Sequence, residues 1–358
     1  MLSLLFFGLL SLGHDTVPPD GPYLFYEDDK VVARWVDTES RTAHEAEFTG
    51  EGEDELPNFP SFRPELIDIN RKFEQITDVH YEGVSRVAAL SDIHGQFDTG
   101  RKLLEANGII DDSLHWSFGD GHLVIVGDIF DRGDQVTELL WLLHNLEIEA
   151  ERAGGKVHFL LGNHETLTLE GDDRYLNPKY RTTASLTGKF YGELYGPTSY
   201  LGRWLRSLPL VVEINNTVYI HGGLSKQMVR EVKSIDRINE LYHEYLIDAD
   251  DLTDVTHDSR RLELMHGENG PLWYRGYFSR NGFDAHDMSY VLRKIGAERI
   301  VVGHTSFTAI HAYFDNRLIA VDSSIKFGNV GEILIVDNGD YFRGTINGER
   351  IPLAVSTK

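Results

Sequence analysis

The sequence predicts an α/β fold in which short buried strands alternate with helices. Two observations support this prediction. Five β-prone runs each lead into a segment that holds glycine and a polar side chain able to bind a metal ion: 91–96, 127–134, 162–165, 221–223 and 303–305. Helical periodicity follows two of these segments, over 97–107 and from 136 to about 153, where Gly154 and Gly155 end the second helix.

The segment Gly127-Asp128-Ile129-Phe130-Asp131-Arg132-Gly133-Asp134 is central to this pattern. It follows the apolar run 123–126, which has the character of a buried strand. Charged side chains between a buried strand and a helix are costly unless they are paired or bind a metal. A structural turn would explain this segment on its own. Its recurrence at four other strand ends favours a functional site, because such sites gather where strands end in loops.

The five segments supply three kinds of metal ligand. These are carboxylate, imidazole and amide oxygen, from Asp92, Asp128, His94, His221, His304 and Asn163. This mixture suits first-row divalent ions better than it suits calcium or a structural zinc site built from cysteines. A single histidine would more simply be a core or surface residue, but five motifs together predict a metal centre.

In order and spacing, the motifs resemble those of the calcineurin-like metallophosphoesterases, and among them the phosphoprotein phosphatases. That family carries GDxHG, GDxxDRG, GNHE, HGG and GHT. Four of these match fully here, and the first has Ser91 in place of glycine, which removes no ligand. The resemblance spans roughly residues 85–345. The segment 271–276, Pro-Leu-Trp-Tyr-Arg-Gly, is most similar to the bacterial Shewanella-like branch, whose members include a cold-active tyrosine phosphatase.

The resemblance implies an αββα sandwich of two mixed sheets flanked by helices, with a small helical cap. It also implies two divalent metal ions, with Mn expected and Fe, Zn, Mg or Ca as alternatives. The first ion would take Asp92, His94 and Asp128, and the second would take Asp128, Asn163, His221 and His304. Asp128 would bridge the pair, and a hydroxide held by both ions would attack the phosphorus.

The same resemblance assigns roles to residues beside the metals. His164 would be the general acid that protonates the leaving group, and Asp131 would hold its tautomer. Arg132 would offer a planar fork to the phosphate oxygens, and Arg275 would be a second arginine. The alternative for Arg275 is a structural salt bridge. Glu165 is expected to orient a ligand or to cap a helix rather than to react.

Composition excludes several classes of function. The 358 residues contain 34 Lys and Arg against 57 Asp and Glu, a formal net charge of −23. Such a chain is a poor nucleic-acid binder, because backbone binding needs clustered Lys and Arg. The chain has no cysteine, which excludes disulfides and the thiol nucleophile of cysteine-dependent tyrosine phosphatases.

The motifs spread from 92 to 304, so we expect one catalytic domain with added segments. Residues 1–13 have the apolar length of a signal peptide, which predicts a periplasmic or secreted protein; a packed tail of a cytoplasmic protein is the alternative. No other stretch has the ~20 apolar residues that span a bilayer. Residues 14–84 would form a hairpin and an acidic loop over 37–62. The phosphoesterase domain would cover 85–345, with a C-terminal tail at 346–358.

The expected cap is the insertion 166–209, which is rich in aromatic side chains: Tyr175, Tyr180, Phe190, Tyr191, Tyr195, Tyr200 and Trp204. One interpretation is a small helical cap with its own core. The other is a rim that accepts an aromatic phosphoester. Both can hold together.

These features predict a metal-dependent phosphomonoesterase that acts on phosphoprotein or phosphopeptide substrates, with phosphotyrosine favoured. A phosphoserine/phosphothreonine phosphatase and a dinucleoside polyphosphate hydrolase are the enzymatic alternatives. The motif Asp131-Arg132-Gly133 and Glu165 after His164 favour the phosphatase. A non-catalytic, metal-stabilised binding module is the alternative from another class.

Overall fold

The computed structural model describes residues 18–50, 56–244, 259–279 and 282–354. The predicted signal peptide at 1–13 therefore lies outside the described residues. Within the described part of the chain, we find no helix that combines the length and the apolar character needed to cross a bilayer.

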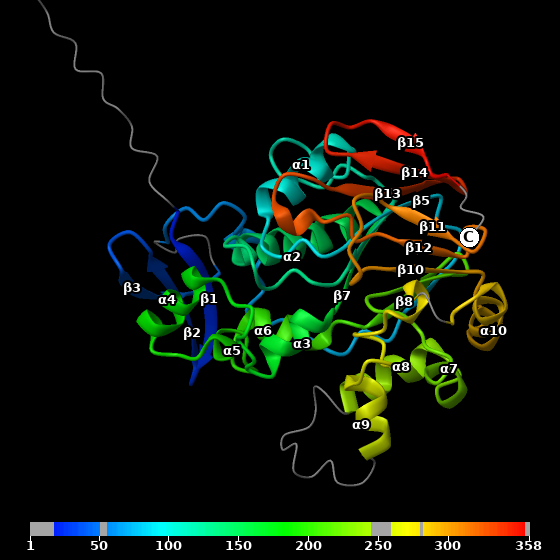
Figure 1. Cartoon of the computed structure of the whole chain (residues 1–358). Coiled ribbons are helices and arrows are strands. Elements are labelled where there is room, and N and C mark those ends of the chain that lie inside the picture. Colours follow the sequence, from blue (N-terminus) through cyan, green and yellow to red (C-terminus); the bar gives the residue numbers. More distant parts are fainter. Residues whose placement is uncertain (1–17, 51–55, 245–258, 280–281, 355–358) are drawn as a thin grey trace, which may run out of the picture.

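Two six-stranded mixed sheets form the core and contact each other where β6 lies near β9 and β7 near β8 (Figure 1). One sheet has the order β15-β14-β13-β5-β6-β7 and consists of β5 (Arg86–Leu90), β6 (His122–Val126), β7 (Lys156–Leu160), β13 (Glu332–Asp337), β14 (Asp340–Thr345) and β15 (Arg350–Pro352). The other has the order β11-β12-β10-β9-β8-β4 and consists of β4 (His80–Tyr81), β8 (Val211–Ile214), β9 (Thr217–Ile220), β10 (Arg299–Val302), β11 (His311–Tyr313) and β12 (Leu318–Ala320).

The strands that precede the five motifs are parallel within each sheet. β5, β6 and β7 run in one direction, and β9 runs parallel to β10 in the other sheet. Every residue of β6 and of β9 is buried, which explains their continuous apolar character. Because parallel strands end at the same edge, the loops after these strands can meet at one place.

Helices cover the outer faces of the sheets (Figure 1). On one side, α1 (Phe97–Ala106) lies beside β13 and α2 (Val136–Ala153) beside β7. On the other, α8 (Ile235–Tyr242) contacts β8, and α7 (Met228–Glu231) packs on α10 (Ala285–Ile295). The short helix α9 (Ser259–His266) lies lower in the view. The predicted αββα architecture is confirmed, and α2 ends at Gly154 in the left-handed conformation.

The N-terminal segment forms a separate three-stranded sheet. The predicted hairpin is present as β1 (Asp20–Glu27) and β2 (Lys30–Asp37), but β3 (Thr42–Phe48) pairs with β2 inside the predicted loop 37–62. The loop prediction is therefore wrong for these residues. Only Phe48 of β3 is buried, so an edge strand with polar side chains on both faces has no apolar alternation to mark it. A short 3-10 helix, η1 (Pro64–Leu66), follows.

The cap insertion contains α3 (Asn163–Leu169), α4 (Pro178–Thr187), α5 (Tyr191–Leu194) and α6 (Tyr200–Ser207). Its core is not its own: α4 packs on β2 and β3, and α6 packs on β1. Most of its aromatic side chains are buried in this shared core: Tyr180, Tyr191, Tyr195, Tyr200 and Trp204. Only Tyr175 and Phe190 are exposed, at 45% and 82%. Most of these rings therefore belong to a core, as the first interpretation expected, although the core is shared. The second interpretation, a rim of many aromatic rings, is wrong.

The predicted C-terminal tail also differs from the structure. Strand β15 lies within 346–358 and pairs antiparallel with β14, so these residues extend the sheet. The described C-terminal residues are therefore part of the domain.

Two buried histidines, His122 in β6 and His158 in β7, make the free energy of unfolding depend on pH. His122 Nδ1 lies 3.0 Å from His158 Nε2, and Tyr81 packs edge-on against both rings. Burial lowers the pKa of His122 to about 4 and the pKa of His158 well below its ordinary value. Below the unfolded pKa of ~6.5 the unfolded chain takes up protons that the folded protein does not.

We therefore expect the free energy of unfolding to fall as the pH drops from about 6.5 towards 4. For His122 the loss by pH 5 is on the order of 1–2 kcal/mol. Urea titrations of the wild type and of His122→Gln at pH 7.5 and pH 5 measure it. Equal pH dependence in the two proteins would show that this histidine does not titrate on unfolding.

Candidate active site

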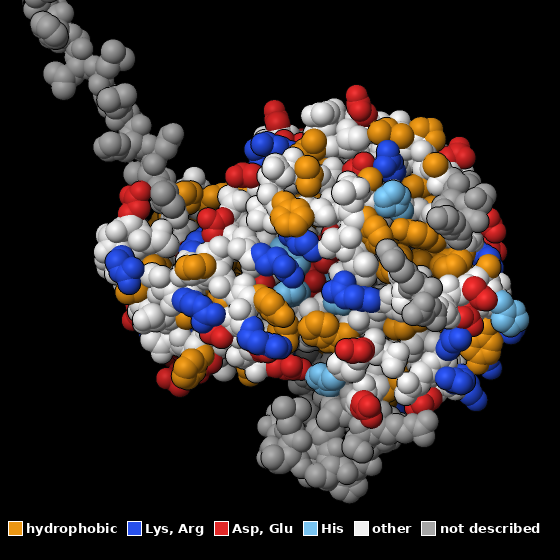
Figure 2. All heavy atoms as spheres, viewed as in Figure 1, with side chains coloured by type: hydrophobic (Ala, Val, Ile, Leu, Met, Phe, Trp, Pro, Cys, Tyr) orange, Lys and Arg blue, Asp and Glu red, His pale blue; other side chains and the backbone are white. Residues whose placement is uncertain are grey.

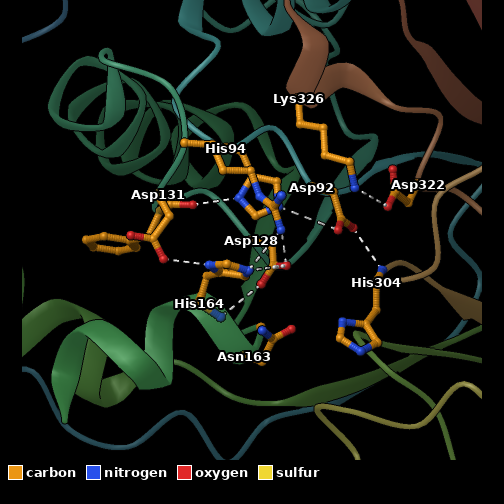
Figure 3. A network of polar contacts seen from close by, with 12 residues as sticks. Asp92, His94, Asp128, Asp131, Asn163, His164, His304, Asp322 and Lys326 are labelled. Atoms are coloured by element: carbon orange, nitrogen blue, oxygen red, sulfur yellow. Dashed lines mark hydrogen bonds and ion pairs between the residues drawn. The ribbon is translucent and has the colours of Figure 1, made fainter. Parts of the chain in front are cut away.

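The loops after β5, β6, β7, β9 and β10 meet at one edge of the two sheets, and they bring together the residues that the motifs predicted (Figure 3). Several of these residues have a left-handed backbone although they are not glycine: Asp92, His94, Asp128, Asp131, Arg132 and His304. Each such conformation costs about 1–3 kcal/mol and persists only when the surrounding structure enforces it. This clustering marks the edge as a functional site.

Asp128 lies at the centre of the metal-capable side chains. Its Oδ2 is 3.3 Å from His221 Nε2 and 3.6 Å from His94 Nε2. Ligand atoms lie within 4.8 Å of one another in two groups that share Asp128: His94, Asp128 and His164, and Asp128, His221 and His304. A carboxylate common to two groups is the arrangement that a pair of cations requires.

The other two predicted ligands, Asp92 and Asn163, lie close to these groups. Asp92 Oδ1 lies 3.8 Å from His94 Nε2, and Asp92 Oδ2 accepts a hydrogen bond of 2.8 Å from the His304 backbone N–H. Asn163 Oδ1 lies 3.0 Å from His221 Nε2. All six predicted ligands are therefore in one cluster, and each is less than 5% exposed.

The histidine tautomers fit a metal site. His94 Nδ1 donates to the Phe130 carbonyl and His221 Nδ1 donates to the Val126 carbonyl, each at 2.7 Å. Both rings therefore turn Nε2 towards the cluster, as metal-binding histidines do. The Nε2 atoms of His94 and His304 are buried and have no hydrogen-bond partner among the described residues. Buried polar atoms are rarely left unpaired, so these residues fit divalent cations.

The pKa shifts of His94 and His304 also fit a metal site. Burial lowers the pKa of His94 and of His304, so both imidazoles are neutral, as ligands must be. Burial favours the neutral form of Asp128, but the histidines around it, His221 first, hold its pKa well below the ordinary value. In return, and against the effect of burial, Asp128 raises the pKa of His221 to about 10.

The pKa of Asp92 is shifted in the opposite direction to that of Asp128. Burial raises its pKa, and the carboxylates of Asp322 and Asp128 raise it further. Two buried carboxylates so close together repel each other unless positive charge lies between them. Divalent cations would supply that charge.

Glu165 fixes the loops that carry these ligands. Its carboxylate is fully buried and accepts hydrogen bonds from the N–H groups of Asp128 at 2.9 Å, Ile129 at 2.7 Å and Gly162 at 2.6 Å. The bond to Gly162 caps the start of α3, because the side chain at the third helical position accepts the N–H of the N-cap residue. Glu165 thus does both things expected of it, since it caps a helix and orients a ligand loop.

His164 and Asp131 form a buried pair beside the metal-capable groups. His164 Nδ1 donates to Asp131 Oδ2 at 2.5 Å, and His164 Nε2 lies 3.4 Å from Arg132 Nη2. The bond to Asp131 leaves Nε2 as the atom that faces a bound molecule. The ring of Tyr175 lies 5.1 Å from the His164 ring.

Arg275 lies beside His304. Its Nη1 donates to the His304 carbonyl at 2.5 Å and to Thr305 Oγ1 at 3.2 Å. The described residues include no carboxylate paired with this guanidinium, so it does not form the structural salt bridge weighed from the sequence.

These side chains line a cavity of about 130 Å³: Asp92, Asp128, Arg132, Asn163, His164, Tyr175, Trp273, Arg275, His304, Ser306 and Lys326. Figure 2 shows Lys and Arg side chains gathered around histidines near the centre of this face. The motifs did not identify Tyr175, Trp273, Ser306 or Lys326 as site residues. Trp273 adjoins Arg275 in a segment that the sequence singled out, whereas Lys326 has no motif around it.

Comparison with known proteins agrees with this geometry. The family model described as calcineurin-like phosphoesterase matches residues 85–306. The crystal structure of a cold-active protein-tyrosine phosphatase from a psychrophilic Shewanella species is similar, with a TM-score of 0.83 and 37% sequence identity. The match covers 94% of this chain and 100% of that one.

Two curated relatives extend the comparison. Shewanella-like protein phosphatase 2 of Arabidopsis thaliana is 26% identical over 319 residues, covering 76% of this chain and 77% of its own. Shewanella-like protein phosphatase 1 of Plasmodium berghei is 29% identical over 262 residues, covering 69% of each. The chain therefore belongs to the calcineurin-like phosphoesterase family, is a homologue of the Shewanella-like protein phosphatases, and is a phosphoester hydrolase.

Proposed function

We propose that this protein is a two-metal phosphomonoesterase that dephosphorylates proteins or peptides, with phosphotyrosine as the preferred residue. The observation that carries the proposal is the hydrogen bond between Asp131 and His164, whose side chain lines the cavity together with Asp92, Asp128 and His304. A non-catalytic metal module would need the ligands but not this pair.

The ligand assignments are those that the family resemblance implies, and the cluster is compatible with them. Asp92, His94 and Asp128 would hold one cation, and Asp128, Asn163, His221 and His304 the other. Oxygen and nitrogen ligands without thiolate are compatible with Mn²⁺, our preferred ion. The cations would lower the pKa of bound water and neutralise charge on the phosphate.

We assign His164 the role of the general acid. Asp131 holds its Nδ1–H, so Nε2 can carry a proton to the departing oxygen. Arg132 and Arg275 line the same cavity and would bind the phosphate oxygens as planar forks. Together these groups bind the anion and protonate the leaving group.

The preference for phosphotyrosine rests on two aromatic rings at the cavity. Tyr175 and Trp273 both line it, and the Trp273 ring lies 5.7 Å from the His304 ring. A phenyl ester needs such a surface just beyond its bridging oxygen. The similar Shewanella structure is that of a protein-tyrosine phosphatase, which supports the same substrate class.

Phosphoserine or phosphothreonine peptides and dinucleoside polyphosphates are the competing substrates. Rates on metal-loaded protein with matched phosphotyrosine and phosphoserine peptides and with diadenosine tetraphosphate test the proposal directly. Faster turnover of either alternative would overturn the phosphotyrosine assignment. We also propose, from residues 1–13 alone, that the protein is exported.

Chelation is expected to abolish hydrolysis of p-nitrophenyl phosphate, and Mn²⁺ is expected to restore it. Asp128→Asn should lower kcat roughly 10³-fold and Asp92→Asn less, because only Asp128 belongs to both ligand groups. Steady-state kinetics with metal analysis of each variant measure this order. Full activity of the metal-stripped wild type would exclude the two-metal mechanism.

His164→Ala is expected to lower kcat for alkyl phosphates about 10²–10⁴-fold while the metal content stays unchanged. The loss should be much smaller with p-nitrophenyl phosphate, whose leaving group departs without a proton. The exposed His311, outside the cavity, provides the control variant His311→Ala. Equal losses on both substrates would show that His164 is not the acid.

Tyr175→Ala and Trp273→Ala should each reduce the phosphotyrosine-to-phosphoserine ratio of kcat/KM about 2–13-fold, because a ring contact contributes ~0.5–1.5 kcal/mol. Phe190→Ala removes an exposed cap ring that does not line the cavity and should leave the ratio unchanged. Matched peptides assayed at one metal concentration give the ratio. If both cavity variants keep it, these rings do not select the substrate.

A further inference from the structure

Lys326 is a third cation in the cavity, and no motif accounts for it. It lies in the 3-10 helix η5 (Ile325–Phe327), after β12, on the side of Asp92 that faces away from Asp131 (Figure 3). Its side chain is only 13% exposed. A lysine with so little contact with water needs an anionic partner.

The partner within the protein is Asp322, with Ser306 between the two. Asp322 is fully buried, and its carboxylate accepts hydrogen bonds from Ser306 Oγ at 2.6 Å and from the Ser324 N–H at 3.0 Å. Lys326 Nζ donates to Ser306 Oγ and lies 3.5 Å from Asp322 Oδ2. The three side chains thus form one connected network at the cavity wall.

The backbone around Lys326 is held as firmly as its side chain. Gln96 Nε2 donates to the Lys326 carbonyl at 3.2 Å, and Thr99 Oγ1 donates to the Gly328 carbonyl at 2.7 Å. Ser324, which starts η5, has a left-handed backbone with φ of 66°. The ammonium group is therefore preorganised, so a ligand that binds it loses little side-chain entropy.

A purely structural ion pair does not explain this arrangement. An ammonium has three N–H donors, and among the described residues Lys326 makes one hydrogen bond, to Ser306. The group also shares a cavity of about 130 Å³ with the guanidinium groups of Arg132 and Arg275. A phosphate that enters this cavity would therefore meet three cationic side chains.

We propose that Lys326, with Ser306 and Asp322, forms an anion subsite that binds a non-bridging phosphate oxygen and selects dianionic monoesters over monoanionic diesters. This inference rests on the proposed function. A phosphomonoester carries nearly two negative charges at pH 7.5, because its second pKa is ~6, whereas a phosphodiester carries one. A third fixed cation therefore favours the monoester.

The test compares variants of the full-length, metal-loaded protein on p-nitrophenyl phosphate and bis(p-nitrophenyl) phosphate at pH 7.5. Lys326→Met is expected to lower kcat/KM for the monoester about 10–100-fold and to change the diester less than about threefold. The inhibition constant for inorganic phosphate should rise by a similar factor. Lys326→Arg should restore much of the loss, and Ser306→Ala should have an intermediate effect.

Lys233→Met is the matched control. Lys233 is an exposed lysine outside the cavity, so this variant loses the same charge without altering the subsite. Thermal unfolding with and without inorganic phosphate provides a readout that does not depend on turnover. At a phosphate concentration near the wild-type inhibition constant, the rise in Tm should be similar for the wild type and Lys233→Met and much smaller for Lys326→Met.

Equal losses on both esters, or an unchanged phosphate inhibition constant in Lys326→Met, would overturn the subsite. If diester turnover is too slow to measure, the inhibition constant for inorganic phosphate and the phosphate-dependent Tm shift decide whether Lys326 binds the anion. A wild type that hydrolyses neither ester would contradict the proposed function instead. In that case a phosphate-dependent Tm shift that is large in the wild type and much smaller in Lys326→Met would still support the subsite.

Discussion

The site depends on one buried carboxylate, that of Glu165, which does not line the cavity. Glu165 accepts backbone N–H groups from the loop after β6 and from the loop after β7, and it is fully buried. Burial raises its pKa, and the nearby Asp128 raises it further. The hydrogen bonds offset part of the cost of burying the charge, since a carboxylate that accepts hydrogen bonds from several N–H groups is stabilised in its charged form. Without Glu165, two ligand loops would lose their common anchor.

Close backbone contact is the second constraint on these loops. Gly127 has φ of 80°, and a Cβ there would lie 2.7 Å from the Gly162 backbone and from His221 Nδ1. A Cβ on Gly162 would lie 2.3 Å from Asp128 Oδ1. The glycines in these two motifs therefore let the strands of both sheets bring their ligands to one point. The ligands could not converge if either position carried a side chain.

The sequence predicted the parts of the site that are encoded locally. Each metal ligand follows a buried strand within a few residues, so the order of strands alone brings Asp92, Asp128 and His221 to one edge. Lys326 was not predicted, because its place in the cavity depends on how η5 packs against α1 and the loop after β10. Its function is visible only in the folded protein.

The aromatic residues of the cap are a second case in which the sequence alone could not predict where side chains lie. Composition identified an aromatic segment, but it could not distinguish rings that face the core from rings that face the cavity. Tyr195 packs 4.9 Å from Phe130 and 6.0 Å from Tyr23, so it belongs to a core shared with the N-terminal sheet. Tyr175 precedes α4 in a turn outside the helices and is therefore free of that core. Helical periodicity could not mark it.

The cap and the N-terminal sheet act on the site through the backbone of the Asp131-Arg132 loop. The Tyr175 carbonyl accepts the Arg132 N–H at 3.1 Å, and Asn177 Nδ2 donates to the Arg132 carbonyl at 2.8 Å. Lys179 Nζ donates to the Asp134 carbonyl at 2.5 Å and lies 3.6 Å from Asp20, which is fully buried in β1. The strained loop that presents Arg132 is thus held from outside the sandwich. Residues far from the motifs in sequence are part of what makes the phosphate-binding geometry possible.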